Sequence, residues 1–242
     1  MKILRTIAVI VAAVSTALSC SIDRGPAGTI ISNARVVDGS GSPSGIVSVR
    51  IVGDRIVTVG EVKPQSDDVV VDAKGLVLSP GFIDVHSHHE YNLLEIPDAL
   101  ATVSQGVTTI AGGMDGGHMY PLADYFDALE KTPAAINVAS FAGFGTIRGE
   151  IMGEDYMRPA TADELAKMVE MLRAELGAGA LGLSSGLEYD PGSFSTPDEV
   201  IALAKVAAAA GGHYISHIRS EDKYFWEAID EIINIGREAN LP

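Results

Sequence analysis

Two histidines, His86 and His88, are the residues of this chain best suited to chemistry. They end the run Pro80-Gly81-Phe82-Ile83-Asp84-Val85-His86-Ser87-His88, which is predicted to be a buried strand. Because side chains alternate faces along an extended strand, both imidazoles should point the same way. Imidazole is the commonest metal ligand among side chains. The spacing therefore predicts part of a metal site, and a pair of exposed loop histidines is the alternative.

Other polar residues follow the ends of later predicted strands. Asp115 lies in a glycine-rich stretch after the strand predicted at 108–112, and His217 lies at the carboxyl end of the one at 214–218. If the carboxyl ends of these strands meet at one mouth, as in a (β/α) barrel, the side chains converge there on a divalent-metal site. Asp115 as a turn residue and His217 as a hydrogen-bonded buried histidine are the alternatives.

Three more histidines are placed outside the predicted ligand set. His213 lies at the opposite end of its strand and is predicted to be structural. His89 and His118 are predicted to lie in loops near the site or to support its ligands.

The elements that must position these residues alternate between strand and helix after residue 80. Strands are predicted at 82–86, 108–112, 136–141, 180–184 and 214–218, with helices at 122–130, 162–176, 197–210 and 224–239. The helix at 162–176 is marked by Thr161 as N-cap and Glu164 three residues on, a capping box. Repeated β-α units imply an α/β fold with a parallel sheet, either doubly wound or closed as a barrel.

A different pattern occupies residues 28–79. Short β-type runs are separated by turn residues, and Gly53-Asp54 is a tight hairpin signal. This pattern predicts a small antiparallel β-sandwich module, followed by a second domain at 80–242.

The first 19 residues are predicted to be a secretory signal. Lys2 and Arg5 precede an uncharged apolar stretch that ends at Cys20, the single cysteine of the chain. Cys20 lies where a bacterial lipoprotein signal places its acylated cysteine, which predicts a lipid-anchored protein of the bacterial cell envelope, periplasmic or on the outer membrane. Ordinary signal-peptide cleavage is the alternative, and a lone cysteine excludes an intrachain disulfide.

Composition excludes other classes of protein. The formal net charge of −15 argues against nucleic acid as a partner, because such binding depends on basic contacts to phosphate. A hydrophobic content of 47% is typical of a globular chain rather than a disordered one.

Four segments together resemble one enzyme family. They are Gly81 to His88, Gln105-Gly106-Val107-Thr108-Thr109, Gly179-Ala180-Leu181-Gly182-Leu183-Ser184-Ser185-Gly186-Leu187-Glu188-Tyr189, and Tyr214-Ile215-Ser216-His217-Ile218-Arg219. The chain resembles the N-terminal half of the N-acyl-D-amino-acid deacylases, or D-aminoacylases, of the metal-dependent amidohydrolase superfamily. The long match at 179–189 is the part that narrows the superfamily to this family.

The resemblance implies a fold, a reaction and roles for residues. The fold would be a (β/α)8 TIM-type barrel, and the substrate a small N-acyl-D-amino acid cleaved to a carboxylic acid and a D-amino acid. One or two divalent ions, Zn²⁺ in the family, would be bound by His86 and His88 at one position and by His217 at the other. Asp115 departs from the family pattern, which has a cysteine there, but a carboxylate can also bridge two ions.

Two residues are implied in substrate binding. Tyr189 and Arg219 are placed where they could contact the carboxylate of the amino acid. A structural ion pair is the alternative role of Arg219.

A closed barrel needs eight strands, whereas about five are found before Pro242. We therefore expect a truncated barrel. The resemblance implies that a general-base aspartate lies beyond Pro242, so the isolated fragment is expected to be without activity.

Two other functions stay open. Dihydroorotases, hydantoinases and dipeptidases share the barrel and the His-x-His motif, although no lysine lies at the predicted strand ends to serve as a carboxylated bridge. A lipid-anchored envelope protein that binds without catalysis is the second alternative.

Overall fold

The computed structural model describes residues 26–241 and divides the chain into two compact units, one ending at Pro80 and the other running from Gly81 to Pro242. The predicted signal sequence and Cys20 lie outside the described residues. Within the described part, no helix has both the length and the apolar character needed to cross a membrane.

The first unit is a five-stranded sheet. Its strands are β1 (Thr29–Val36), β2 (Gly45–Val52), β3 (Arg55–Gly60), β4 (Val69–Asp72) and β5 (Val77–Leu78). The order is β3-β2-β1-β4, and β5 also pairs with β1. The predicted hairpin turn joins β2 to β3, with Gly53 at φ +57°.

The prediction of an antiparallel module is wrong for two strands. β1 pairs with β2 and β2 with β3 in antiparallel fashion, but β4 and β5 run parallel to β1. The connection at 61–68 leads from β3 to β4 without a hairpin, so β4 begins beside the start of β1 and runs in its direction. The described residues of this unit form one sheet, so the second layer of a sandwich is not seen among them.

An ion pair fixes that connection. Arg50 Nη2 lies 2.8 Å from Asp68 Oδ1, and the Asp68 side chain is fully covered. The same carboxylate accepts backbone N–H bonds from Gly28 and Gln65. The Arg50 guanidinium, together with these N–H donors, holds the pKa of Asp68 well below its ordinary value.

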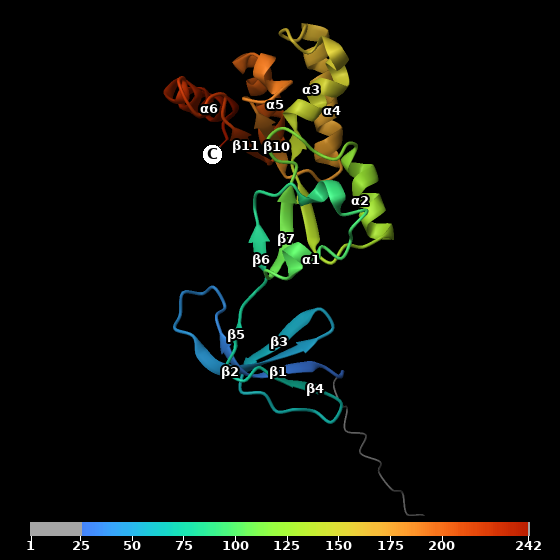
Figure 1. Cartoon of the computed structure of the whole chain (residues 1–242), viewed down its shortest axis with the longest axis vertical. Coiled ribbons are helices and arrows are strands. Elements are labelled where there is room, and N and C mark those ends of the chain that lie inside the picture. The colour runs from blue at the N-terminus through green and yellow to red at the C-terminus, as the bar shows by residue number, and fades with distance from the viewer. Residues whose placement is uncertain (1–25, 242) are drawn as a thin grey trace, which may run out of the picture. The chain divides into compact units, whose positions relative to one another are not determined.

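The second unit is built on parallel strands in chain order. They are β6 (Phe82–Asp84), β7 (Val107–Gly112), β8 (Asn137–Ser140), β9 (Ala142–Gly143), β10 (Gly182–Gly186) and β11 (His213–His217). The pairings run β6-β7-β8 and β9-β10-β11, all parallel, and the arrows of β6 and β7 point the same way in Figure 1. Phe141, between β8 and β9, donates its N–H to Gly112 O at 3.0 Å, which connects the two sets.

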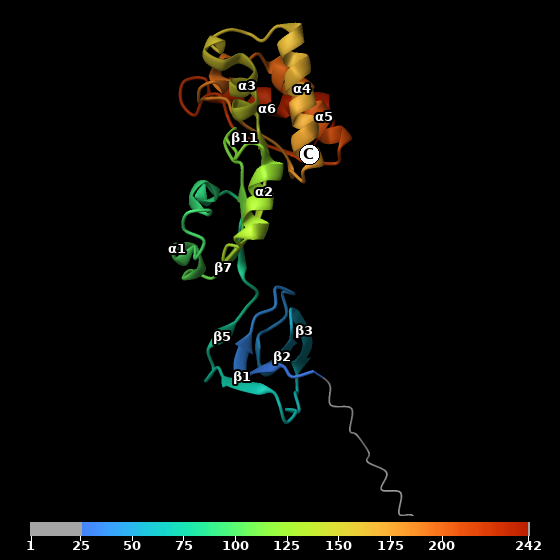
Figure 2. The ribbon, with the colours of Figure 1, turned by 90° about the vertical axis from the view of Figure 1, so that its right-hand side faces the viewer.

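Helices follow most of these strands. They are α1 (Leu100–Val103), α2 (Leu122–Lys131), α3 (Phe144–Met152), α4 (Ala162–Gly177), α5 (Pro197–Ala209) and α6 (Phe225–Ala239), with the 3₁₀ turns η1 (His89–Asn92), η2 (Gly153–Asp155) and η3 (Gly192–Phe194). In Figures 1 and 2, α3 to α6 gather around β10 and β11. The predicted capping box at Thr161 and Glu164 is confirmed.

The main core of this unit lies among α3, α4, α5 and β10. Phe144, Met168, Leu172, Leu183 and Leu203 are all fully buried there. All five residues of β10 are buried. The packing therefore holds β10 in place, and β10 is the strand that lies next to the glycine-rich loop carrying Asp115.

Candidate metal centre

The first group of ligating side chains consists of His86, His88 and Asp115. The Nε2 atoms of both imidazoles lie 3.1 Å from Asp115 Oδ2. Their ligand atoms all lie within 4.8 Å of one another. Each imidazole is about half exposed, whereas the carboxylate is 18% exposed, so the group lies open to solvent on one side.

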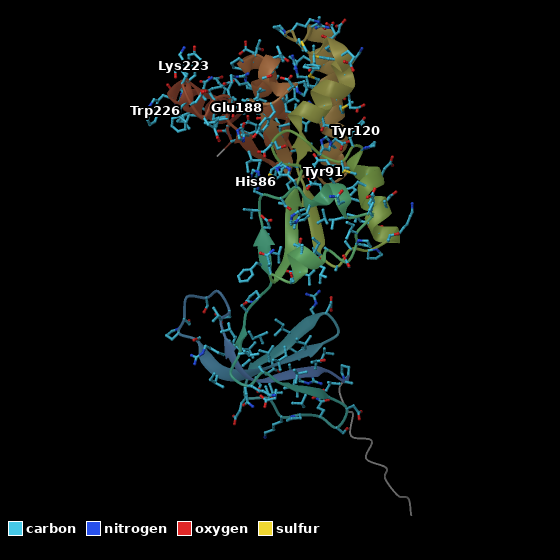
Figure 3. The ribbon with its side chains drawn as sticks, viewed as in Figure 1. His86, Tyr91, Tyr120, Glu188, Lys223 and Trp226 are labelled. Atoms are coloured by element: carbon cyan, nitrogen blue, oxygen red, sulfur yellow. The ribbon has the colours of Figure 1, made fainter. Side chains whose placement is uncertain are left out.

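The local backbone at His86 differs from the prediction. Strand β6 ends at Asp84, so His86 lies in a bend and not within the strand, just beyond the arrowhead of β6 in Figure 3. Asp84 Oδ1 accepts the N–H of His86 at 3.2 Å, a local turn that ends the strand. Ser87 N–H still bonds to Ala111 O, and both imidazoles face Asp115.

Asp115 is held in an uncommon backbone conformation. Its φ is +54°, and the neighbouring Gly113 and Gly116 are also in the left-handed region. A Cβ at Gly113 would lie 2.1 Å from Phe141 O, so that position has no space for a side chain. The tight loop turns the Asp115 side chain toward the two imidazoles.

A second group forms around His217. Its Nε2 atom lies 3.0 Å from Glu188 Oε2 and 3.6 Å from Glu221 Oε1. His217 is thus grouped with two carboxylates and not with His86 and His88. Gly186 of β10 lies between the two groups. It pairs with His217 in register, and a Cβ at Gly186 would lie 2.2 Å from Asp115 O.

Tyr189 lies close enough to both groups for their carboxylate charges to act on it. Its hydroxyl oxygen is 3.1 Å from His217 Nδ1. Burial, followed by the charges of Asp115, Glu188 and Glu221, raises the pKa of the Tyr189 phenol. The phenol therefore stays protonated near neutral pH and remains a hydrogen-bond donor.

Arg219 has protein partners. Its Nε and Nη2 atoms each lie 2.8 Å from an oxygen of Glu231, and Nη1 donates to Ser193 O at 3.0 Å. Of the two roles that the sequence left open, this geometry favours the structural ion pair.

Two of the remaining histidines support the loops. His118 is buried, its Nδ1 accepts the N–H of Gly143 at 2.9 Å, and its Nε2 lies 3.2 Å from Glu175 Oε2. Because Nδ1 accepts, the ring proton is on Nε2 and is donated to Glu175. His89 Nδ1 lies 3.0 Å from Thr102 Oγ1, between η1 and α1.

His213, the histidine predicted to be structural, begins β11. It therefore lies at the opposite end of that strand from His217, and it is exposed.

Sequence reasoning missed Glu188 and Glu221. Both had a signal, because Glu188 lies two residues after the end of β10 within the 179–189 segment and Glu221 lies four residues after His217. The same criterion that selected Asp115, a polar residue just after a strand, would have found Glu188.

The donor atoms suit a divalent ion. Tetrahedral ligands at about 2.0–2.2 Å from an ion lie about 3.3–3.6 Å apart, close to the 3.1 Å between Asp115 Oδ2 and each imidazole nitrogen. The set is nitrogen and oxygen only, which Zn²⁺ and other first-row divalent ions accept. Asp115, Glu188 and Glu221 add negative charge, and no guanidinium or ammonium is paired with them in the described part of the chain.

Comparison with known proteins gives consistent matches. The sequence model of the Amidohydrolase family matches residues 69–242. The D-aminoacylase of Alcaligenes xylosoxydans xylosoxydans is 34% identical over 91% of this chain, and the N-acyl-D-aspartate deacylase of that organism is 36% identical over 86%. The crystal structure of N-acyl-D-glutamate deacylase from Bordetella bronchiseptica, complexed with zinc and a phosphonate inhibitor, superposes with a TM-score of 0.82 at 32% identity over 89% of this chain.

The chain spans about half the length of these relatives. It covers 50% of the D-aminoacylase, 47% of the aspartate deacylase and 50% of the chain in the Bordetella structure.

Proposed function

Because this chain belongs to the amidohydrolase family, we propose that the protein of which it is part hydrolyses the amide bond of N-acyl-D-amino acids with the help of a divalent metal ion. The products would be a carboxylic acid and a free D-amino acid. The observation that carries this proposal is the convergence of His86, His88 and Asp115, which come from two separate strand ends, on one small volume.

The residues present assign parts of the chemistry. His86, His88 and Asp115 would hold one ion, and His217, with Glu188 beside it, would hold a second. A bound divalent ion polarises the scissile carbonyl and lowers the pKa of water toward neutrality. The half-exposed imidazoles leave the first group open on the side from which a substrate would approach.

Tyr189 is proposed to orient the substrate. Its protonated phenol can donate a hydrogen bond to the carboxylate of the amino acid, and it lies beside His217. All three guanidinium nitrogens of Arg219 already have partners, Glu231 and the Ser193 carbonyl. We therefore assign the contact with the substrate carboxylate to Tyr189 rather than to Arg219. Tyr189→Phe should therefore raise KM for N-acetyl-D-amino acids more than it lowers kcat, and an unchanged KM would contradict this role.

The strand order supports the finer fold proposal. Parallel strands that pair in chain order with helices between them are the arrangement from which a (β/α)8 barrel closes. Phe82, Ile83 and Val85, at the free edge of the sheet, are apolar and exposed. We infer that further strands of a closed barrel cover them, and that the β-sheet of the first unit is one layer of a sandwich.

The test compares histidine variants of the protein at its full native length. Metal content and release of D-amino acid from N-acetyl-D-amino acids are measured for the wild type, His86→Asn, His88→Asn and His213→Asn. His213 is the matched control, since it is an exposed histidine at the opposite end of a strand. We expect metal and activity to be lost in the first two variants and kept in the third.

Other results would contradict parts of the proposal. A wild-type protein that binds metal but cleaves only cyclic amides or dipeptides would replace the substrate assignment. Purification without stoichiometric metal, with ligand binding unchanged in His86→Asn, would favour a binding protein instead.

The envelope location is also proposed. It is supported by the apolar stretch ahead of Cys20, the residue that would carry the lipid. Labelling with a radioactive fatty acid should mark the wild type and not Cys20→Ala, whereas equal labelling would exclude this anchor.

A further inference from the structure

The hydroxyl of Ser184, on β10, connects the two sides of the loop that carries Asp115. It donates a hydrogen bond to Gly113 O and accepts one from Gly116 N–H at 3.3 Å. Ser184 is fully buried, so water cannot replace either bond in the folded chain. The Ser184 hydroxyl is thus a donor to the backbone before Asp115 and an acceptor from the backbone after it.

The other backbone groups of these two glycines are bonded as well. Gly113 N–H donates to Glu90 Oε1 at 2.7 Å, and Gly116 O accepts the N–H of Thr146 at 2.9 Å. All four backbone groups therefore have partners, and Ser184 supplies two of them. The loop is held by η1, α3 and β10 together.

The conformation of Asp115 makes this restraint matter. A φ of +54° is uncommon for a non-glycine residue, although Asp and Asn adopt it more readily than others, so contacts around the loop help to hold Asp115 in it. With Ser184 removed, Gly113 O and Gly116 N–H lose their shared partner. Asp115 can then relax toward negative φ, which turns its carboxylate away from the two imidazoles.

We propose that Ser184 is a positioning residue for the metal site: its hydroxyl, by bridging Gly113 and Gly116, holds Asp115 where its carboxylate can share a divalent cation with His86 and His88. This inference rests on the proposed metal-dependent function. Groups that hydrogen-bond directly to a metal ligand typically contribute about 10- to 100-fold in metal affinity, and we expect Ser184, which acts through the backbone on either side of Asp115, to contribute no more than this range.

The next residue on the strand is a matched control. Ser185 is also fully buried, and its hydroxyl also has two partners, Tyr214 Oη and Ser216 Oγ, each at 2.7 Å. These partners belong to β11 and not to the loop. Ser184→Ala and Ser185→Ala thus delete the same atom at the same burial, and differ in what that atom holds.

The experiment measures Co²⁺ binding to the full-length apoprotein, by competition with a chromophoric chelator and by the visible absorption of bound Co²⁺. We expect Ser184→Ala to bind Co²⁺ more weakly, by no more than about 10- to 100-fold, with an altered visible spectrum. Ser185→Ala should match the wild type in both readouts. Ser184→Thr, which keeps the hydroxyl, should restore most of the affinity.

A double-mutant cycle tests whether Ser184 acts through Asp115. Asp115→Asn tolerates the left-handed backbone and removes the charge, so it should weaken Co²⁺ binding strongly in the wild type and in Ser185→Ala. The effect should be much smaller in Ser184→Ala, where the carboxylate is already displaced. If Ser184→Ala does not fold, all variants are made in the Gly149→Ala background, a helix substitution with free space around the added methyl group.

The outcomes separate this inference from the function on which it rests. Equal weakening by Ser184→Ala and Ser185→Ala, or a full effect of Asp115→Asn in Ser184→Ala, would overturn the positioning role while leaving the metal site intact. A wild-type protein that binds no Co²⁺ would overturn the proposed function and this inference with it.

Discussion

The buried pair Arg148 and Glu199 gives the sharpest stability prediction. Arg148 is fully buried in α3, and its Nη1 contacts Glu199 Oε2. Arg148 Nη2 also donates to Tyr156 O at 3.2 Å, while Glu199 Oε1 accepts the N–H of Thr196 at 3.1 Å. The pair thus connects α3, the start of α5 and the loop before α4.

Arg148→Met removes the only cationic side chain that is paired with the Glu199 carboxylate in the described part of the chain. Breaking a buried pair from one side costs about 3–5 kcal/mol, because the remaining charge is left without compensation. The exposed pair Arg173 and Glu170, 3.5 Å apart with side chains 56% and 76% exposed, is the matched control. Arg173→Met should cost about 0–1 kcal/mol.

The double variant Arg148→Met with Glu199→Gln tests the cause of this loss. It removes the uncompensated charge, while the amide oxygen can still accept the bond from Thr196. Arg148 Nε has no partner, so the native pair is itself imperfectly satisfied. We therefore expect the double variant to be more stable than Arg148→Met alone by about 1–3 kcal/mol.

Urea unfolding followed by the helical circular-dichroism signal is the assay. All α-helices of the described chain lie beyond residue 81, so this signal reports the second unit alone. The reasoning is refuted if Arg148→Met loses no more unfolding free energy than Arg173→Met. It is also refuted if the double variant is less stable than Arg148→Met by the full cost of a second lost partner.

Three further predictions concern acid stability, the loop and a helix cap. The pKa of Asp68 is lowered in the folded state by Arg50, so its contribution to stability is present above the unfolded value of about 4 and is lost as pH falls through the folded value. The melting temperature of Asp68→Asn should thus lie below that of the wild type at neutral pH, with the difference shrinking in acid; a constant difference would argue against this linkage. Gly113→Ala should lower the free energy of unfolding by at least about 1–2 kcal/mol, because its φ is +71° and the added methyl group would meet a backbone carbonyl. Gly149→Ala, within α3, should raise it by about 0.5–1 kcal/mol, because the methyl group has free space there. Urea unfolding measures both, and equal effects would contradict the loop geometry. Thr161→Ala should lower the stability of the second unit by about 1 kcal/mol through loss of the α4 cap, and hydrogen exchange that is unchanged in the first turn of α4 would speak against the capping role.

Helix and strand positions were largely predictable from local sequence pattern. The four helices predicted after residue 120 begin and end within two residues of α2, α4, α5 and α6. Their caps and apolar spacing are local signals. Helix α3 was missed, because Phe144–Met152 contains two glycines and its buried Arg148 breaks the apolar pattern.

The candidate site was predictable in its residue types and not in its grouping. His86, His88 and Asp115 each lie after a strand and His217 is the last residue of one, positions that the sequence pattern indicated. The sequence did not show that His217 lies with Glu188 and Glu221. That arrangement depends on the register between β10 and β11, which is a long-range property.

By itself, then, the sequence determined where most strands and helices form and which histidines could bind a metal, because periodicity, caps and turn residues act over a few positions. Only the tertiary structure decided that Ser184 bridges the loop around Asp115 across 71 positions of chain, that β4 runs parallel to β1, and that Arg219 pairs with Glu231. These contacts form between segments distant in the chain, so they depend on how the strands align and pack rather than on local composition.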